Sequence, residues 1–172
     1  MEVGYDAVGM RDIARAVGKQ PPQLYRLQLT KSDILAEIII ELNQEQIDVL
    51  PVLLATVEGG NAFERTCSYL VGLYASDIAY KPIRSIGAAF GWTWQAPYED
   101  AVIAQVMQLL APVADWLRRD GFDEIESRCY GIWSLYYVGY RRAVMRSASA
   151  RECLDEILGP LRLLFQKNAY TK

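Results

Sequence analysis

Hydrophobic residues recur every three or four positions along most of this chain, which is the spacing of one face of an α-helix. Residues 30–33 (Thr-Lys-Ser-Asp) have the composition of a helix start, and the apolar positions after them predict a long helix over 34–54 with a kink or break near Pro51. After a glycine-rich turn at 59–60, the same spacing predicts a second long helix over 61–79.

Further helices are predicted over the second half of the chain. A short helix opens at Pro82 and ends in the aromatic-rich connector "FGWTWQAPYED" (90–100). Longer helices are predicted over 97–117, 125–146 and 154–165, and a proline inside the first and the last of them predicts bends. No stretch shows the alternation of a half-buried strand, so the predicted fold class is all-α.

The stretch "MRDIARAVGKQPPQLYRL" (10–27) predicts two short helices separated by a turn at Gly18. The first helix is predicted to bury one apolar face, formed by Met10, Ile13, Ala14 and Val17. Pro21 and Pro22 suit the first turn of the second helix, where amides have no partner within the helix. Leu24 and Leu27 are expected to face back toward the first helix.

Charge separates this stretch from the remainder of the chain. Of the 172 residues, 52% are hydrophobic, and the formal net charge is −3. Residues 10–31 hold five basic residues against one acid, a net charge of +4, so the rest of the chain carries −7. This asymmetry predicts a basic module on an acidic body.

Several classes of function are disfavoured by the composition. There is no histidine, no phosphate-binding glycine loop and no nucleophile motif, so an enzyme is not predicted. The three cysteines lie far apart without a C-x-x-C pair and are expected to be buried thiols, and no metal or cofactor is predicted. No run is long enough to span a membrane and the N-terminus does not resemble a signal peptide, so a cytoplasmic protein is predicted.

Two short helices joined by a tight turn, with amide and guanidinium side chains on the second, are typical of a helix–turn–helix that reads DNA bases. The alternative is a plain helical corner with a solvated face, and spacing alone does not decide between them. The candidate DNA contacts are Lys19, Gln20, Pro21, Gln23, Tyr25, Arg26 and Lys31.

The segment "GYDAVGMRDIARAVGKQPPQLYRLQLTKSDIL" (4–35) resembles the DNA-binding signature of TetR-family transcriptional regulators. The matching residues are Gly4, Tyr5, Arg11, Ile13, Ala14, Gly18, Leu24, Tyr25, Lys31 and Leu35. The resemblance implies a DNA-binding unit over 1–35 and a helical domain over 36–172 that binds an effector and dimerises. The departures from the family pattern are Gly9, Gln20, Gln28 and Leu29. The family's first helix would precede Gly4, so the unit is incomplete as given, and we expect residues upstream of Met1 to complete it.

The larger domain carries a heavy aromatic load, much of it in the connector 90–100, where packing alone does not demand it. Aromatic walls with a few polar groups are what a small-molecule site needs, although plain core packing is the alternative for each residue. The candidate walls are Tyr74, Trp92, Trp94, Tyr98, Trp133 and Tyr137, and the candidate polar anchors are Arg84, Gln95, Gln105 and Arg128.

The segment "GIWSLYYVGY" (131–140) is apolar nearly all round, which predicts contacts both with the interior and with a second subunit, aided by Gly131 and Gly139. A homodimer through about 123–168 is therefore predicted. The resemblance implies a repressor that an apolar or aromatic effector releases from double-stranded operator DNA, with coupling along the long helix from Ser32 to the kink near Pro51. The alternative is a ligand-binding or interaction protein that has lost DNA binding.

Overall fold

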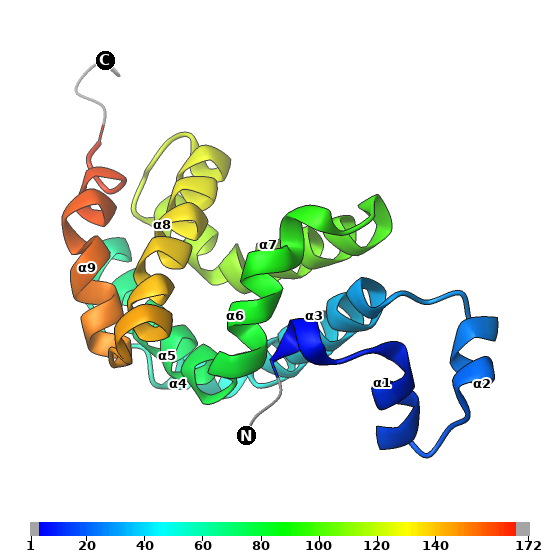
Figure 1. Cartoon of the computed structure of the whole chain (residues 1–172). Coiled ribbons are helices and arrows are strands. Elements are labelled where there is room, and N and C mark those ends of the chain that lie inside the picture. Colours follow the sequence, from blue (N-terminus) through cyan, green and yellow to red (C-terminus); the bar gives the residue numbers. More distant parts are fainter. Residues whose placement is uncertain (1–3, 168–172) are drawn as a thin grey trace.

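The computed structural model describes residues 4–167, and its regular structure in this range is entirely helical (Figure 1). The all-α class is therefore confirmed. The α-helices are α1 (Met10–Ala16), α2 (Pro21–Arg26), α3 (Lys31–Asp48), α4 (Leu50–Ala55), α5 (Ala62–Ala79), α6 (Lys81–Phe90), α7 (Ala96–Arg119), α8 (Ile125–Arg146) and α9 (Ala150–Leu163). Two short 3₁₀ helices are η1 (Tyr5–Ala7) and η2 (Gly91–Thr93). Residues 1–3, expected to be the tail of a preceding helix, lie outside the described residues.

Local capping sets where the long helices begin. The Thr30 hydroxyl accepts a hydrogen bond from the Asp33 backbone N–H at 3.1 Å, and the Asp33 carboxylate accepts one from the Thr30 N–H at 2.7 Å. Asn61 caps α5 by accepting from the Glu64 N–H at 3.0 Å. Such caps satisfy amides that the first helical turn leaves without partners, and each stabilises its helix by about 1 kcal/mol.

The predicted helix over 34–54 is divided into α3 and α4 at Val49. Pro51 has no backbone N–H, and its ring would clash with the carbonyl four residues earlier if α3 continued. The proline therefore sits in the first turn of α4. Pro112 and Pro160, by contrast, lie inside α7 and α9, which continue through them.

The main core lies among α5, α7, α8 and α9, where α8 packs along α9 (Figure 1). Tyr69, Leu117, Ile132 and Ile157 are fully buried in it. Burying a large apolar side chain contributes about 1.5–3 kcal/mol, so these helix faces supply most of the stability of the fold.

A smaller apolar cluster joins α3 to α6. Leu35, Ile39 and Leu42 of α3 are buried there, with Ile83, Ile86, Phe90, Trp94 and Tyr5 packed around them. This cluster attaches η1 to the helical body, whereas α1 and α2 project away from that body (Figure 1).

The packing between α1 and α2 departs from the sequence expectation. Ala14 is fully buried, but Val17 is 57% exposed, so its predicted burial was wrong. Leu27, expected to face the first helix, is 62% exposed. Leu27 is the residue that ends α2, and Gln28 after it has a φ of 56°, which turns the chain away. Gly18 ends α1 with a φ of 66°, as predicted.

The three cysteines are free thiols, with Cys129 and Cys153 buried and Cys67 half-buried. Burial raises the pKa of Cys67 to about 11, so this thiol is neutral at physiological pH. Within residues 4–167, no helix has both the length and the apolar character needed to cross a membrane.

Candidate ligand cavity and basic surface

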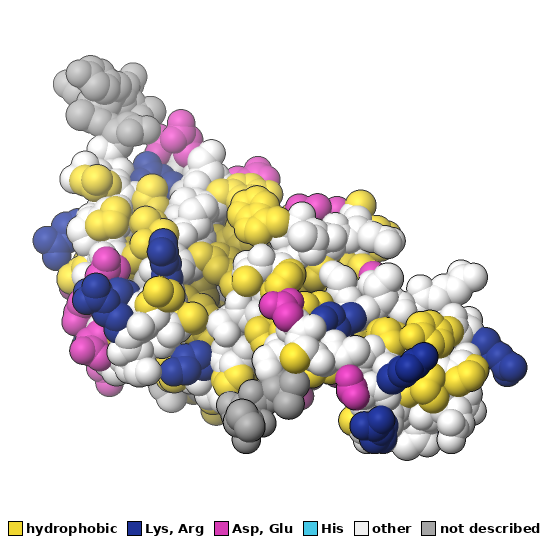
Figure 2. Space-filling view, viewed as in Figure 1, with side chains coloured by type: hydrophobic (Ala, Val, Ile, Leu, Met, Phe, Trp, Pro, Cys, Tyr) yellow, Lys and Arg dark blue, Asp and Glu magenta, His cyan; other side chains and the backbone are white. Residues whose placement is uncertain are grey.

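A cavity of about 570 Å³ lies between α3, α5, α6, α7 and α8, a size typical of small-molecule sites. Figure 2 shows hydrophobic side chains gathered between α8 and the neighbouring α6 and α7. The apolar and aromatic wall of the cavity includes Ile39, Leu70, Leu73, Trp92, Trp94, Val102, Ile103, Val106, Leu109, Leu110, Trp133, Tyr136, Tyr137 and Tyr140. The wall also includes three small residues of α6 and η2, Gly87, Ala88 and Gly91.

One side of the cavity is polar and is organised around the carboxylate of Asp77. Gln46 donates to Asp77 Oδ1 at 2.7 Å, and the Tyr136 hydroxyl donates to Asp77 Oδ2 at 2.8 Å. Arg84 Nε lies 3.2 Å from Asp77 Oδ1, forming an ion pair in which both side chains are nearly buried. The Tyr140 hydroxyl donates to the Asp77 backbone carbonyl at 3.1 Å. Four helices therefore meet at one carboxylate.

Burial controls the protonation of this group. It raises the pKa of Asp77, while the Arg84 guanidinium and the hydrogen bonds from Tyr136 and Gln46 oppose the rise. Burial also raises the pKa of Tyr136 well above its ordinary value, reinforced by the Asp77 charge beside it. Tyr136 therefore keeps its proton at neutral pH and remains a donor to Asp77.

Two donors of the cavity wall have no acceptor. Arg84 Nη1 donates to Asn43 Oδ1 at 2.5 Å, but Nη2 has no hydrogen-bond partner. The indole Nε1 of Trp94 is also buried without a partner. A buried donor left unpaired costs about 1–3 kcal/mol, so these two atoms call for an explanation.

Five of the ten predicted effector contacts line the cavity, namely Arg84, Trp92, Trp94, Trp133 and Tyr137. They come from α6, η2, the connector after it and α8. Trp92 is 95% exposed, so it forms part of the rim. The aromatic connector therefore contributes to the cavity as its composition suggested.

The structure places the other five predicted contacts outside the cavity wall. Tyr74 lies behind it, stacked on Tyr136 with ring centroids 4.3 Å apart. Gln105 is buried and donates to the Ile40 carbonyl at 3.0 Å. Gln95 precedes the first turn of α7 as its N-cap residue, and Tyr98 in that turn is also not part of the wall.

Arg128 was predicted as a polar anchor and has a structural position instead. Its Nη2 pairs with Asp123 Oδ1 at 2.8 Å, and its Nη1 donates to the carbonyls of Leu164 and Gln166. The guanidinium also lies over the Phe122 ring, 5.1 Å from its centroid. Arg128 thus fastens the start of α8 to the segment that follows α9.

Sequence reasoning missed the polar residues Asn43, Gln46 and Asp77. A signal for them exists, because each falls on the apolar face of its helix: Asp77 three positions after Tyr74, and Asn43 four after Ile39. An acid on a buried helix face needs a cation or donors to offset its desolvation. Arg84, a basic residue on the next helix, could therefore have been predicted as the partner of Asp77.

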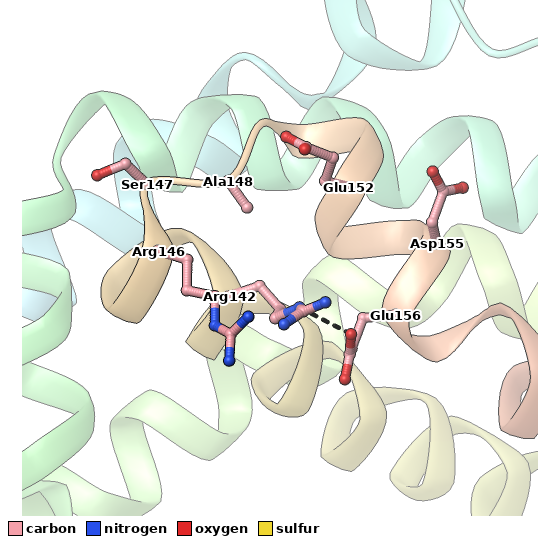
Figure 3. Close-up of a pocket in the computed structure, with 7 residues that line it drawn as sticks. All are labelled: Arg142, Arg146, Ser147, Ala148, Glu152, Asp155 and Glu156. Atoms are coloured by element: carbon pink, nitrogen blue, oxygen red, sulfur yellow. Dashed lines mark ion pairs between the residues drawn. The ribbon is translucent and has the colours of Figure 1, made fainter.

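A second cavity, of about 460 Å³, lies where α8 turns into α9 (Figure 3). It is open and polar, and part of its charge is already paired. Arg142 pairs with Glu156 at 2.7 Å, and Glu152 accepts from the Ser149 N–H and hydroxyl as part of the α9 cap. Because its lining has no aromatic side chain, this cavity is the weaker candidate for an apolar ligand.

The predicted DNA contacts lie on and around α2. Lys19, Gln20, Gln23, Tyr25 and Arg26 are exposed and Pro21 is half-buried. Figure 2 shows Lys and Arg side chains around the projecting α1–α2 end of the molecule. Gln23 also has a local role, because its side-chain oxygen accepts from the Gln20 N–H at 2.9 Å and so caps α2.

Lys31, predicted to contact phosphate, has an intramolecular role in the structure. Its ammonium donates to the carbonyls of Tyr5 and Val8 at 3.0 and 3.1 Å. It also lies 4.1 Å from the centroid of the Tyr5 ring, which packs against Phe90 at 4.7 Å. Lys31 therefore anchors η1 to the start of α3, next to the last residue of α6.

In the described part of the chain, no cluster of three or more acidic or sulfur ligands is arranged to hold a metal ion. Comparison of the chain with protein-family models, curated proteins and solved structures gave no match. The structure thus defines an all-helical protein with an aromatic, ligand-sized cavity and a separate basic helix pair.

Proposed function

We propose that this protein is a ligand-responsive, DNA-binding transcriptional regulator. The observation that carries the proposal is the contact of Tyr5 with Phe90, because it links the two candidate sites. Phe90 ends α6, a helix of the cavity wall, and Tyr5 belongs to η1, which precedes α1 and is held by Lys31. A change in α6 would therefore reach the segment that leads into the basic helix pair.

The DNA-binding half rests on α2 and the residues before it. Lysine and arginine side chains suit phosphate oxygens, and the exposed amide group of Gln23 suits the edge of a base. The basic charge of residues 10–31 contrasts with the acidic remainder, which orients this end of the molecule toward DNA. The resemblance of residues 4–35 to TetR-family regulators agrees with this assignment.

The ligand-binding half rests on the cavity. A ligand shifts a conformational equilibrium only if it binds one form better than the other. The cavity draws its wall from five helices, so its shape depends on their spacing. A ligand that fits one spacing would favour the conformation in which α1 and α2 are displaced from the DNA-binding arrangement, and repression would end.

The DNA-binding half is tested by selecting duplexes from a random-sequence pool and measuring affinity against salt concentration. Lys19→Ala and Arg26→Ala should each weaken binding to selected and random duplexes alike and reduce the salt slope by about one. The matched control is Arg146→Ala, which removes an exposed positive charge at the far end of α8 and should change neither quantity. Equal effects of all three substitutions would contradict the proposal.

Base readout is tested with Gln23. Gln23→Glu keeps an oxygen that can accept from the Gln20 N–H, so α2 keeps its cap, but it removes the amide donor and adds a charge that phosphates repel. We expect normal thermal stability and lost preference for the selected duplex. A variant that retains full sequence preference would exclude Gln23 from base readout.

A second candidate function is a ligand-binding protein that does not bind DNA. The observation that favours it is the exposure of Val17 and Leu27 beside a helix α2 of only six residues. If no duplex is selected while ligands still bind in the cavity, this second function is the correct one.

A further inference from the structure

The charges that line the cavity between α3, α5, α6, α7 and α8 do not cancel. Three charged residues belong to its wall, namely Asp77, Arg84 and Glu99. Arg84 Nε pairs with Asp77 Oδ1 at 3.2 Å, so these two charges offset each other. Glu99 is exposed and forms no ion pair with any residue in the range 4–167. The wall therefore carries one uncompensated negative charge.

The position of Glu99 on α7 puts this charge at the mouth of the cavity. Val102 and Val106, three and seven positions after Glu99, line the same cavity, so the three residues share one face of the helix. Exposure falls along this face, from the exposed Glu99 through the half-buried Val102 to the buried Val106. The carboxylate thus lies where the cavity meets solvent, and a ligand can reach it without displacing a protein partner.

Aromatic side chains with accessible surface also line the cavity. Trp92 and Trp94 come from η2 and the connector after it, directly before the first turn of α7, and Trp92 is 95% exposed. Trp133 and Tyr137 of α8 add two rings whose centroids lie 5.9 Å apart. The face of an aromatic ring, and of indole most of all, attracts a cation placed over it. One free carboxylate and several aromatic rings are groups that bind an organic cation.

The interior of the cavity determines the rest of the ligand. The innermost wall includes four buried leucines, Leu70, Leu73, Leu109 and Leu110. An apolar or aromatic body fits this wall, and its transfer from water is favourable by about 25 cal/mol per Å² of buried surface. The unpaired donors Arg84 Nη2 and Trp94 Nε1 have almost no accessible surface, so a ligand in the cavity does not reach them. An anion would meet Glu99 and find Arg84 already paired with Asp77.

We propose that the ligand is a lipophilic organic monocation. Its apolar, aromatic body fills the interior, and its tertiary or quaternary ammonium group lies at the mouth with Glu99 and the neighbouring indole rings. The attraction between opposite charges is about four times stronger at the effective dielectric constant of about 20 near a protein surface than in bulk water, so a single carboxylate can select the charge of the ligand. This assignment rests on the ligand-binding half of the proposed function and names the chemical class of its ligand.

The test compares probes that share a ring system and differ in charge. On naphthalene and on anthracene, the 2-(trimethylammonio)methyl compound is the cation, the 2-neopentyl compound replaces its nitrogen by carbon at the same shape, and the 2-acetate is the anion. Binding to the whole chain is measured by equilibrium dialysis at micromolar concentration. The cation should bind about tenfold or more tighter than the anion, because Glu99 attracts one and repels the other. This preference should shrink at high salt concentration.

Glu99→Gln attributes that preference to one carboxylate, because it removes the charge at nearly constant size. The cation should bind about fivefold to tenfold more weakly to this variant and the anion more tightly, while the neutral probe should stay within about twofold. Asp100→Asn is the matched control, because it makes the same change of charge on the next residue, outside the cavity wall, and should change the cation-to-anion ratio by about twofold or less. Glu99 also lies in the first turn of α7, where a carboxylate stabilises the helix, and the melting temperature reports that effect separately.

Trp92 tests the contribution of the indole rings. Trp92→Leu should weaken binding of the cation about two- to fivefold relative to the neutral probe, and Trp92→Phe should recover part of this loss because it restores an aromatic face. Trp92 is almost fully exposed, so neither substitution disturbs the core. Equal losses for the cation and the neutral probe in Trp92→Leu would exclude this ring from cation binding.

The outcomes separate this inference from the proposed function. Equal binding of cation and anion by the wild type, or tighter binding of the anion, overturns the cation assignment but leaves the cavity as a ligand site. A Glu99→Gln variant that keeps the wild-type ratio, or that loses the neutral probe together with the cation, also overturns it. Absence of binding by every probe on both ring systems overturns this inference and the ligand-binding half of the function together, whereas DNA binding is measured independently.

Discussion

Gly139 lies in the middle of α8 at a position where no side chain fits. A Cβ atom built there would lie 2.6 Å from the Cys153 carbonyl oxygen and still closer to the Tyr74 hydroxyl. Gly131 in the same helix faces Leu164 in a similar way, at 2.9 Å. Both glycines therefore serve packing within the chain, and the expectation that they also admit a second subunit gains no support from their surroundings.

Gly139→Ala should lower the free energy of unfolding by about 1–3 kcal/mol or more, because the backbone of Cys153 cannot move aside as a flexible side chain would. Gly159→Ala in α9 is the comparison, since nothing beyond its two chain neighbours lies within 4 Å of a Cβ there. Its gain in helix propensity is opposed by the ring of Pro160, which follows it, so it should change stability by less than about 1 kcal/mol. Urea unfolding of both variants checks this, and equal effects would contradict the packing argument.

Asp77 gives the protein a specific pH dependence. Burial raises the pKa of Asp77 in the folded state, so the folded protein binds this proton more tightly than the unfolded chain does. The contribution of Asp77 to stability therefore falls as pH rises through the folded-state pKa and recovers on acidification toward the unfolded value of about 3.9.

The measurement is the melting temperature of the wild type and of Asp77→Asn between pH 7 and pH 4. Asparagine does not titrate, so the wild type should gain stability relative to the variant as the pH falls. A difference that stays constant, or that grows in favour of the variant on acidification, would show that the folded-state pKa is not raised.

At the scale of an element, α6 lines the cavity and also contacts η1, the segment that leads into the basic helix pair. Arg84, Gly87 and Ala88 belong to the cavity wall, while Phe90 contacts Tyr5. A Cβ at Gly87 would lie 2.6 Å from the Ile39 side chain, so α6 is held close to α3. The sequence predicts that ligand binding is coupled to DNA binding along α3 as far as the kink near Pro51. The contact of α6 with η1 offers a second route.

Phe90→Ala should weaken the coupling between the cavity and the basic helix pair without altering either of these two sites. Affinity for a probe, a small aromatic compound found to bind in a thermal-shift screen, and for the selected duplex should each stay within about threefold of wild type, while the loss of DNA binding caused by the probe becomes smaller. Phe63→Ala is the control, because Phe63 also makes an aromatic contact, with Phe165 at 5.4 Å, but lies away from α6. If probe-induced release from DNA is unchanged in Phe90→Ala, the coupling runs elsewhere.

At the scale of the whole molecule, α8 and α9 combine a packed inner face with apolar residues on the outside. The exposed residues are Tyr130, Tyr137, Val138, Val144, Met145 and Leu163. Apolar side chains gathered on two adjoining helices favour association with a second copy, which buries them symmetrically. The predicted homodimer through about 123–168 stays a prediction on this basis.

Sedimentation velocity at micromolar concentration should give a dimer for the wild type and a monomer for Val138→Asp, because a carboxylate at the centre of the interface would be buried without a partner. Val138 is 54% exposed, so the substitution leaves the core intact. Val52→Asp on α4, where valine is 70% exposed, should remain dimeric. A monomeric wild type would contradict the predicted interface. It would also contradict the binding of a dimer to two DNA half-sites.

The sequence alone determined the features that depend on neighbours along the chain. Thr30 and Asp33 predict the start of α3. Gly18 and Gly121 adopt the positive φ that ends a helix, and Pro51 separates α3 from α4. These effects act over one helical turn, so the residue types within that turn are sufficient to predict them. The fold class and most helix ranges followed from the same local signals.

Only the tertiary structure decided which side chains form the cavity. Tyr74 and Tyr136 both lie on apolar faces of long helices, yet Tyr136 lines the cavity and Tyr74 is stacked behind it. Lys31 was predicted to contact DNA and Arg128 to anchor the ligand, but both donate to backbone carbonyls of distant segments. Helical spacing fixes the face on which a residue lies, whereas its partner depends on how helices far apart in sequence pack together, and no local pattern encodes that packing.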